Sequence, residues 1–210
     1  MLSNCGANCG PNYQEKKIVY FYKMGKANTE DTLRLAKERF DELGLKKVII
    51  STSFGDTAIK ALDYFKGEEL VVITSMYGHR EPGKESIKPE NRQKLEEAGA
   101  KIINTTHLFA GIDRSINRRY GGITLTQFMG QVFKMLGEGF KVCAEMGGMA
   151  ADCGGIPVDE EVMAIAGTSR GCDTAVVLVP AHSNDFFRLQ FKEIVCLPRV
   201  RSLRAGTPHL

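Results

Sequence analysis

Residues 48–74 read VIISTSFGDTAIKALDYFKGEELVVIT, and the architecture of the domain follows from this stretch. The continuous apolar runs at its two ends, 48–50 and 70–74, predict strands that are covered on both faces. Between them, apolar residues recur with helical spacing from 56 to 65, and Gly67 ends the helix. Because neighbouring parallel strands need a crossover helix of this kind, the stretch predicts one strand–helix–strand unit of a parallel sheet.

The same alternation extends upstream and downstream of this stretch. The other predicted helices are bounded by residues typical of helix ends, with Asn28 and Thr124 as N-caps, Pro89 in a first turn and Gly44 as a stop. Two further strands are predicted by β-rich runs, at 18–22 and 101–105. The helix that follows Thr124 places four apolar side chains on one face: Leu125, Phe128, Val132 and Leu136.

Beyond residue 139 the pattern changes, because apolar runs follow one another with only short helices or none between them. Four strands are predicted there, at 140–145, 162–166, 175–179 and 194–197. Strands that are not separated by crossover helices are typically antiparallel. The sequence therefore predicts a three-layer α/β/α fold whose sheet is mostly parallel and partly mixed.

Composition excludes several classes of protein. Of 210 residues, 43% are hydrophobic and 25% charged, which is ordinary for a domain with a substantial core, and the net charge of +3 is too small for a nucleic-acid-binding surface. No apolar run is long enough for a membrane span or a signal peptide, so we expect a soluble, cytoplasmic protein. We expect one domain at 16–199, with tails at 1–15 and 200–210. The sequence leaves open whether the chain forms a homo-oligomer.

The six cysteines do not form the pattern of a disulfide framework. Cys143 and Cys196 lie in apolar runs that we interpret as strands, so we expect reduced, buried thiols. Cys5 and Cys9 stand four residues apart in a Gly- and Asn-rich segment, NCGANCGPN. A zinc site needs about four ligands, and no second close pair completes one, so we favour a flexible tail over a metal site.

Two loops follow predicted strands and carry groups that bind phosphate. The loop STSFGDTA, at 51–58, joins a strand to a helix and contains five hydroxyl or carboxylate side chains around Gly55. Small residues allow backbone N–H groups to approach an anion at a helix N-terminus, so we favour phosphate binding over an ordinary N-cap. The loop AGTSRGCDTA, at 166–175, adds the guanidinium of Arg170 to a similar set. For this second loop, a phosphate site and a simple hairpin turn both stay open.

Histidines and arginines follow other predicted strands. His79 lies in YGHREPG, and the long loop after residue 105 carries His107 and Arg114; His182 follows the run that ends at residue 179. Long ordered loops are more often functional than decorative, whereas any single histidine is more often structural. Glu145 could act as a base at a strand end, although we favour a short helix over its neighbours 149–152. Motifs of proteases, serine esterases, nucleotide hydrolases and dinucleotide enzymes are absent.

The first loop resembles the phosphate-binding effector loop of the C-terminal domain of pyruvate kinase. More widely, the segments KKIVYF, NTEDTLRLAKER, SFGDTA, GFKVCAEM, MAADCGGIPVDEEV, DTAVVLVPAH and EIVCLPR resemble a small family of stand-alone, mainly archaeal proteins with a pyruvate kinase C-terminal-like fold. The resemblance covers most of 16–199 and implies flavin mononucleotide (FMN) as the cofactor, without implying a known reaction. Pyruvate kinase itself has its active site in a separate barrel domain, which 210 residues cannot include.

Two hypotheses follow from the loops and the resemblance. The first is an FMN-binding protein, an oxidoreductase of unknown substrate; the alternative is a non-catalytic sensor that binds a sugar phosphate or nucleotide effector. The catalytic residues are unknown, no metal is expected, and the small phosphorylated ligand is the expected partner. The expected ligand-binding residues are Ser51, Thr52, Ser53, Gly55, Asp56, Thr57, Thr74, His79, His107, Gly111, Arg114, Gly167, Thr168, Gly171 and Thr174.

Overall fold

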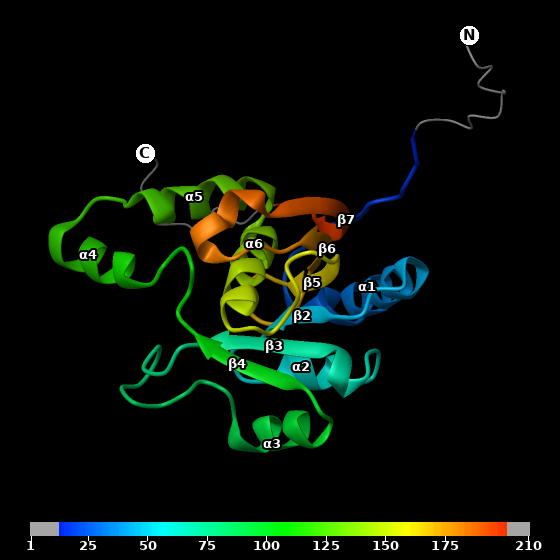
Figure 1. The fold of residues 1–210 in the computed structure, drawn as a ribbon, viewed down its shortest axis with the longest axis horizontal. Helices are drawn as coiled ribbons and strands as arrows, with labels where there is room; N and C mark the ends of the chain where they lie inside the picture. Colours follow the sequence, from blue (N-terminus) through cyan, green and yellow to red (C-terminus); the bar gives the residue numbers. More distant parts are fainter. Residues whose placement is uncertain (1–12, 201–210) are drawn as a thin grey trace, which may run out of the picture.

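A computed structural model describes residues 13–200 of the chain. Its centre is one seven-stranded sheet with the strand order β1-β7-β6-β5-β2-β3-β4 (Figure 1). Neighbouring strands are parallel except for the pairs β5–β6 and β6–β7, which are antiparallel. Six strands therefore point in one direction and β6 in the other, which confirms the predicted α/β fold with a mostly parallel, partly mixed sheet.

The strands coincide closely with the predicted apolar runs. Their bounds are β1 Val19–Phe21, β2 Val48–Ser51, β3 Leu70–Ser75, β4 Lys101–Thr105, β5 Val162–Ala166, β6 Thr174–Val179 and β7 Gln190–Pro198. The central strands β2, β3 and β5 are buried over almost their whole length. Continuous burial explains why these strands are apolar at every position instead of alternating.

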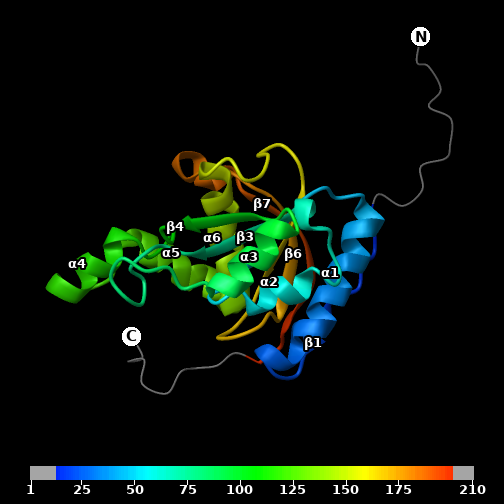
Figure 2. The ribbon, with the colours of Figure 1, turned by 90° about the horizontal axis from the view of Figure 1, so that it is seen from below.

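The α-helices cover both faces of this sheet. Their bounds are α1 Thr29–Leu43, α2 Asp56–Ala61, α3 Pro89–Glu97, α4 Ile112–Tyr120, α5 Leu125–Phe133 and α6 Glu138–Asp152. Short 3-10 helices lie at Lys26–Asn28, Gly67–Glu69, Lys134–Leu136 and Ser183–Arg188. Figure 2 shows α1, α2 and α3 on one side of the sheet and α6 on the other.

Two apolar cores lie on the two faces of the sheet. Val48 and Ile50 of β2 pack with α1, α2 and α3, whereas Ile49 of the same strand packs with α6. In a strand, successive side chains point to opposite faces, so one strand supplies both cores. Between residues 13 and 200, no helix combines the length and the apolar composition that a membrane span requires.

The strand predicted at 140–145 is wrong, because these residues lie in helix α6. Eleven of the fifteen residues of α6 are buried, so the helix lacks the amphipathic pattern that identifies helices from sequence. The glycines inside α6 also argue against a helix when only the sequence is considered. A Cβ atom at Gly147 would lie 2.8 Å from the Cδ1 atom of Leu189. A Cβ atom at Gly148 would lie 2.7 Å from the Cδ2 atom of Leu108. The close approach of neighbouring side chains therefore accounts for glycine inside a helix.

Helices α1 and α5 begin at the predicted N-cap residues, but only one of these residues caps its helix through its side chain. Thr124 caps α5 and forms a capping box with Gln127. Asn28 occupies the N-cap position of α1, but its side chain donates to the backbone oxygen of Lys23 instead. Gly44 ends α1 in the left-handed conformation that favours glycine, with φ 62°.

The cysteines within residues 13–200 are free thiols: Cys143, Cys153, Cys172 and Cys196. Cys143 is buried as expected, but it lies on α6 and not on a strand. Cys196 is buried on β7. The expectations for Cys5 and Cys9 concern residues outside the described range.

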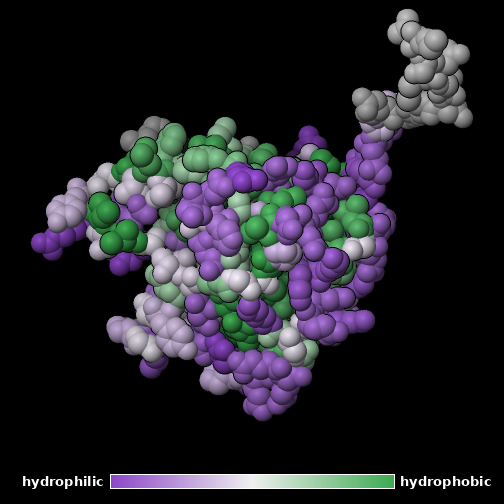
Figure 3. All heavy atoms as spheres, viewed as in Figure 1, coloured by the Kyte–Doolittle hydropathy of each residue, from purple (hydrophilic) through white to green (hydrophobic). Residues whose placement is uncertain are grey.

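The apolar face predicted for the helix after Thr124 lies on the outer side of α5 and of the 3-10 helix that follows it. Leu125, Phe128, Val132 and Leu136 are all exposed, while Met129 and Phe133 pack toward α6. Hydrophobic side chains therefore gather over α4 and α5 on the surface of the molecule (Figure 3).

Candidate functional site

Loops from four strands meet at one edge of the sheet. Because β2, β3, β4 and β5 are parallel, the segments that follow them lie at the same carboxyl edge. These segments are the β2–α2 loop (52–55), the β3–α3 loop (76–88), the β4–α4 loop (106–111) and the β5–β6 loop (167–173). Ligands of open α/β sheets bind at this edge. The two glycine-containing loops identified in the sequence are thus brought to the same side of the protein.

The β2–α2 loop is shaped largely by contacts with α3. Asn91 donates to the backbone oxygen of Phe54 at 2.9 Å and to the Asp56 carboxylate at 3.0 Å. Lys88 also bonds to Asp56 at 3.0 Å and is the main cause of a lowered Asp56 pKa. The Asp56 carboxylate is therefore ionised and is paired with Lys88 at the start of α3.

Gly55 has a structural reason to be glycine. Its φ is 95°, and a Cβ atom there would lie 2.6 Å from the Cβ atom of Asn91. Its N–H group donates to the Thr52 hydroxyl at 3.0 Å. A substitution at Gly55 would consequently disturb packing and backbone conformation whether or not a phosphate binds nearby.

Phe54 is the point at which three loops converge. The guanidinium of Arg80, from the β3–α3 loop, lies 4.7 Å from the centre of the Phe54 ring. The guanidinium of Arg170, from the β5–β6 loop, lies 5.5 Å from the same centre. Cation–π contacts hold both arginines against this ring. Two guanidinium groups, each with several N–H donors, therefore flank the loop that the sequence assigns to phosphate.

The β5–β6 loop is organised by the fully buried carboxylate of Asp173. It accepts hydrogen bonds from the Gly25 N–H at 2.7 Å, the Thr168 N–H at 3.3 Å and the Thr174 hydroxyl at 3.0 Å. The hydroxyl of Thr174 is therefore used inside the protein. Since three backbone or side-chain donors converge on one carboxylate, the loop has a well-defined conformation without a ligand.

Two expected ligand-binding glycines in the β5–β6 loop also have packing roles. A Cβ atom at Gly171 would lie 2.3 Å from the Thr29 hydroxyl, and one at Gly167 would lie 2.6 Å from the Cα atom of Cys172. Both glycines let the loop pass close to neighbouring backbone. Arg170, between them, is exposed and reaches toward the β2–α2 loop. The loop therefore places Arg170 beside the β2–α2 loop.

His79 and His107 form a pair next to these loops. Their rings meet edge to face with centroids 5.2 Å apart, and Arg114 of α4 lies 3.4 Å from the Nδ1 atom of His79. Burial lowers the pKa of His79, and Arg114 lowers it further. Burial also lowers the pKa of His107, with Lys141 adding to the effect and Glu145 opposing it. Both rings are therefore neutral at pH 7 and can accept or donate hydrogen bonds.

Glu145 anchors the loop that carries His107. Glu145 is 3% exposed, and its carboxylate accepts a hydrogen bond from the Phe109 N–H at 3.0 Å and pairs with Lys141. Sequence reasoning placed Glu145 at a strand end, where it could act on a ligand. On α6 it instead joins the helix to the β4–α4 loop.

Thr74 carries an unpartnered polar group. Its hydroxyl is buried and has no hydrogen-bond partner within residues 13–200, a property that it shares with Ser86. The residue before Thr74 is Ile73, and its backbone oxygen accepts a hydrogen bond from the Thr52 N–H at 3.0 Å. A buried hydroxyl without a partner is uncommon in proteins. Of the expected residues, Thr74 is the one that the structure leaves with such a group.

The remaining expected residues lie in or beside the same loops. Ser51, Thr52 and Ser53 are partly buried at the end of β2, and Thr57 is buried in α2. Gly111 is the N-cap of α4, and a Cβ atom there would lie 2.7 Å from the Cγ2 atom of Thr106. Sequence reasoning missed Phe54 and Arg80, although both lie in loops that it selected.

His182 does not join the other two histidines. It follows β6, the strand that runs against the others, so it lies at the opposite edge of the sheet. There its Nδ1 atom is 3.3 Å from Asp152, which also accepts a hydrogen bond from the Ser183 N–H. The predicted similarity of the three histidines is therefore limited to His79 and His107.

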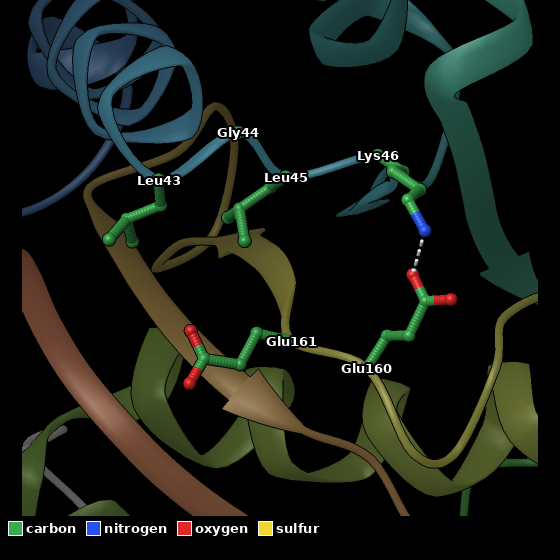
Figure 4. Close-up of a pocket in the computed structure, with 6 residues that line it drawn as sticks. All are labelled: Leu43, Gly44, Leu45, Lys46, Glu160 and Glu161. Carbon is green, nitrogen blue, oxygen red and sulfur yellow. Dashed lines mark hydrogen bonds and ion pairs between the residues drawn. The ribbon is translucent and has the colours of Figure 1, made fainter.

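Two surface cavities lie away from the carboxyl edge. One, of about 330 Å³, lies where the chain enters β2 and β5 (Figure 4). Lys46 and Glu160 form a 2.9 Å ion pair across it. Another, of about 620 Å³, is a groove beside β1 and α1. Neither cavity is lined by any of the expected ligand-binding residues.

Within residues 13–200, no three His, Cys, Asp or Glu side chains are grouped so that they could hold a metal ion. Comparison with models of known protein families finds none that matches this chain.

Proposed function

We propose that the carboxyl edge of the sheet binds a phosphorylated small molecule, and that this molecule is FMN. The observation that supports the proposal best is the convergence of Arg80 and Arg170 on Phe54. Guanidinium groups bind phosphate through paired hydrogen bonds, and both groups lie beside the hydroxyl-rich β2–α2 loop.

Different residues at this edge would bind different parts of the ligand. Arg80, Arg170 and the hydroxyls of Thr52 and Ser53 would hold the phosphate. The unpartnered hydroxyl of Thr74 offers a further hydrogen-bonding group, which favours a ligand with several polar atoms. When bound, FMN would supply electron-transfer chemistry through its ring.

The neutral histidines would contact the uncharged part of the ligand. Burial keeps His79 and His107 unprotonated at pH 7, so neither places a positive charge beside an aromatic ring system. Arg114 fixes the orientation of His79 through its 3.4 Å contact. The two neutral rings suit hydrogen bonding to a heteroaromatic ring.

The test compares FMN with riboflavin, which lacks the phosphate. A double variant, Arg80→Gln and Arg170→Gln, removes both guanidinium groups, and Arg188→Gln with Lys192→Gln is the control with the same change of charge at the opposite edge. Each charge-assisted hydrogen bond contributes roughly 1.5–3 kcal/mol, so the first variant should bind FMN at least about a hundredfold more weakly. Riboflavin binding should change little in either variant.

Equal affinity of the wild-type protein for FMN and riboflavin, measured by quenching of flavin fluorescence, would contradict the proposed phosphate site. An unchanged FMN affinity in the Arg80/Arg170 variant would do the same.

A sensor of a sugar phosphate or nucleotide is the second candidate, because guanidinium groups recognise a phosphate whatever is attached to it. The absorption spectrum of freshly purified protein distinguishes the two. Bound oxidised flavin absorbs visible light, whereas a sugar phosphate does not. A colourless protein that rejects FMN but is stabilised against heat by a sugar phosphate would favour the sensor.

A further inference from the structure

The segment 112–136 exposes an unusual number of apolar side chains. Nine of the eighteen exposed large hydrophobic residues within 13–200 fall in this segment, with between 41% and 84% of their area exposed. We call these nine residues the arm surface: Ile112, Ile116, Tyr120, Ile123, Leu125, Phe128, Val132, Met135 and Leu136. Isolated surface hydrophobics are normal, whereas a concentration of this kind indicates an interaction surface.

Helix α5 is held rigidly from its inner side. The ring of Phe133 stacks on Phe109 with centroids 5.7 Å apart and meets Phe186 edge to face at 6.0 Å. Gly130 is buried, and a Cβ atom there would lie 3.3 Å from the Cβ atom of Phe109. Because its inner side is fixed in this aromatic cluster, α5 presents its outer side chains in a defined arrangement. Preordered side chains lose little conformational entropy on binding.

Helix α4 is attached to α5 and to the rest of the protein by polar contacts. Hydrogen bonds from the Thr126 and Thr124 side chains lower the pKa of Asp113, and Arg114 contacts His79. None of the residues of α4 is buried. Ile112, Ile116 and Tyr120 are spaced four residues apart and share one side of the helix. A nine-residue helix with an uncovered apolar stripe gains much of its stability from a partner.

The chemistry of α5 argues against a lipid surface as this partner. Its sequence, LTQFMGQVF, contains no Lys, Arg, Asp or Glu. Helices that lie on membranes combine an apolar face with a polar face rich in Lys and Arg, and the other side of α5 is instead buried in the aromatic cluster. The outer stripe of α5 carries no charge, so two copies of this stripe can pack together without repulsion between like charges; Arg114, Arg118 and Arg119 belong to α4.

The area of the arm surface suits a dimer. Large side chains present on the order of 150–200 Å² each when fully exposed, so the nine together offer roughly 1,000 Å². A stable interface buries about 800 Å² on each partner. The outer stripe of α5, with Leu125, Phe128 and Val132, provides about a third of this area, and the rest comes from α4 and the residues on either side of α5.

We infer that two copies of this chain associate through the arm surface, with α5 packed against α5 of the partner across a two-fold axis. In such an isologous interface each residue occurs twice, and a stripe at helical spacing is complementary to itself. Phe128, as the aromatic residue on the outer side of α5, lies at the centre of the contact.

The test measures the mass of the full chain by sedimentation equilibrium over a range of concentrations. The wild-type protein should approach twice the 23.2 kDa of one chain. Phe128→Glu should weaken self-association at least about a hundredfold, because a charge is buried twice in each dimer. Phe128→Leu should leave the dimer intact. Tyr22→Glu is the control for an exposed aromatic side chain outside the arm surface.

Circular dichroism and thermal unfolding of Phe128→Glu establish that this variant is folded, and the milder Phe128→Ala keeps the comparison available if it is not. A wild-type protein that stays monomeric at all concentrations would overturn the inference, whether or not it then binds vesicles of anionic lipid. A dimer that withstands Phe128→Glu in the folded state would also overturn it. Neither measurement involves FMN, so the outcome is independent of the proposed function.

Discussion

Glu145 on α6 accepts a 3.0 Å hydrogen bond from the backbone N–H of Phe109, and this bond fixes the loop that carries His107. Phe109 also begins the aromatic cluster beneath α5. A single buried carboxylate thus connects the candidate ligand site with the base of the arm surface.

Replacing Glu145 should destabilise the protein strongly. Glu145→Ala leaves the Lys141 ammonium and the Phe109 N–H unpaired in a buried environment, which should cost about 3–5 kcal/mol in the free energy of unfolding. Glu138→Ala is the matched control, because Glu138 forms an ion pair with Lys134 of the same i,i+4 type near the surface. Its removal should cost about 1 kcal/mol or less. Urea denaturation measures both, and equal losses would show that the buried pair has no special role.

Two glycines with similar backbone conformations should tolerate alanine very differently. Gly171 has φ 77° and Gly83 has φ 71°. At Gly83 nothing lies within 4 Å of an added Cβ atom, so Gly83→Ala should cost only the left-handed strain, about 1–2 kcal/mol. At Gly171 the added atom would also meet the Thr29 hydroxyl, so the loss should be about 1–3 kcal/mol greater. Chemical denaturation of the two variants would reveal whether close packing determines the β5–β6 loop; similar losses would argue against it.

Stability should fall as the pH decreases below about 6.5. Burial lowers the pKa of His107 and of His79 in the folded protein, while the unfolded chain keeps ordinary values near 6.5. The unfolded state therefore binds protons first as the pH falls, and protonation favours unfolding until the folded histidines also titrate. His107→Gln should reduce the slope of unfolding free energy against pH between 7 and about 5.5. A slope that is unchanged in this variant would exclude His107 as its source.

Thiol reactivity should be confined to one of the described cysteines. Burial raises the pKa of Cys196 to about 12 and also raises the pKa of Cys143 and Cys172, so these thiols stay protonated and inaccessible. Cys153 is exposed. In a variant with Cys5→Ser and Cys9→Ser, iodoacetamide should modify Cys153 quickly and the other three only after unfolding. Mass spectrometry of peptides locates the label, and rapid labelling of Cys172 in the native protein would contradict the packing around Thr29.

The sequence predicts those features of the candidate site that depend on the order of the strands. The loops at 51–58 and 166–175 were selected because polar residues and glycines follow apolar runs, and parallel strands bring their carboxyl ends to one edge. The contact of Arg80 and Arg170 with Phe54 joins residues from three loops. Such contacts depend on how the loops bend after each strand, and no local pattern records that.

His182 and the segment 140–145 show where local reasoning fails. His182 follows an apolar run as His79 and His107 do, but β6 is reversed, so the same local pattern leads to the other edge. Four of the six residues at 140–145 are apolar because α6 is buried on nearly all sides, and buried helices and buried strands have similar composition. Both outcomes are set by the position of an element in the fold.

The sequence by itself determined the alternation of strands and helices, since hydrophobic periodicity and helix-end residues act over a few neighbouring positions. It also determined that Leu125, Phe128 and Val132 share one side of a helix. Only the tertiary structure decided that this side faces outward, because both sides of α5 are apolar and its inner side is taken by the cluster around Phe133. Periodicity fixes which residues lie together, whereas packing against the rest of the chain selects which of two apolar sides is buried.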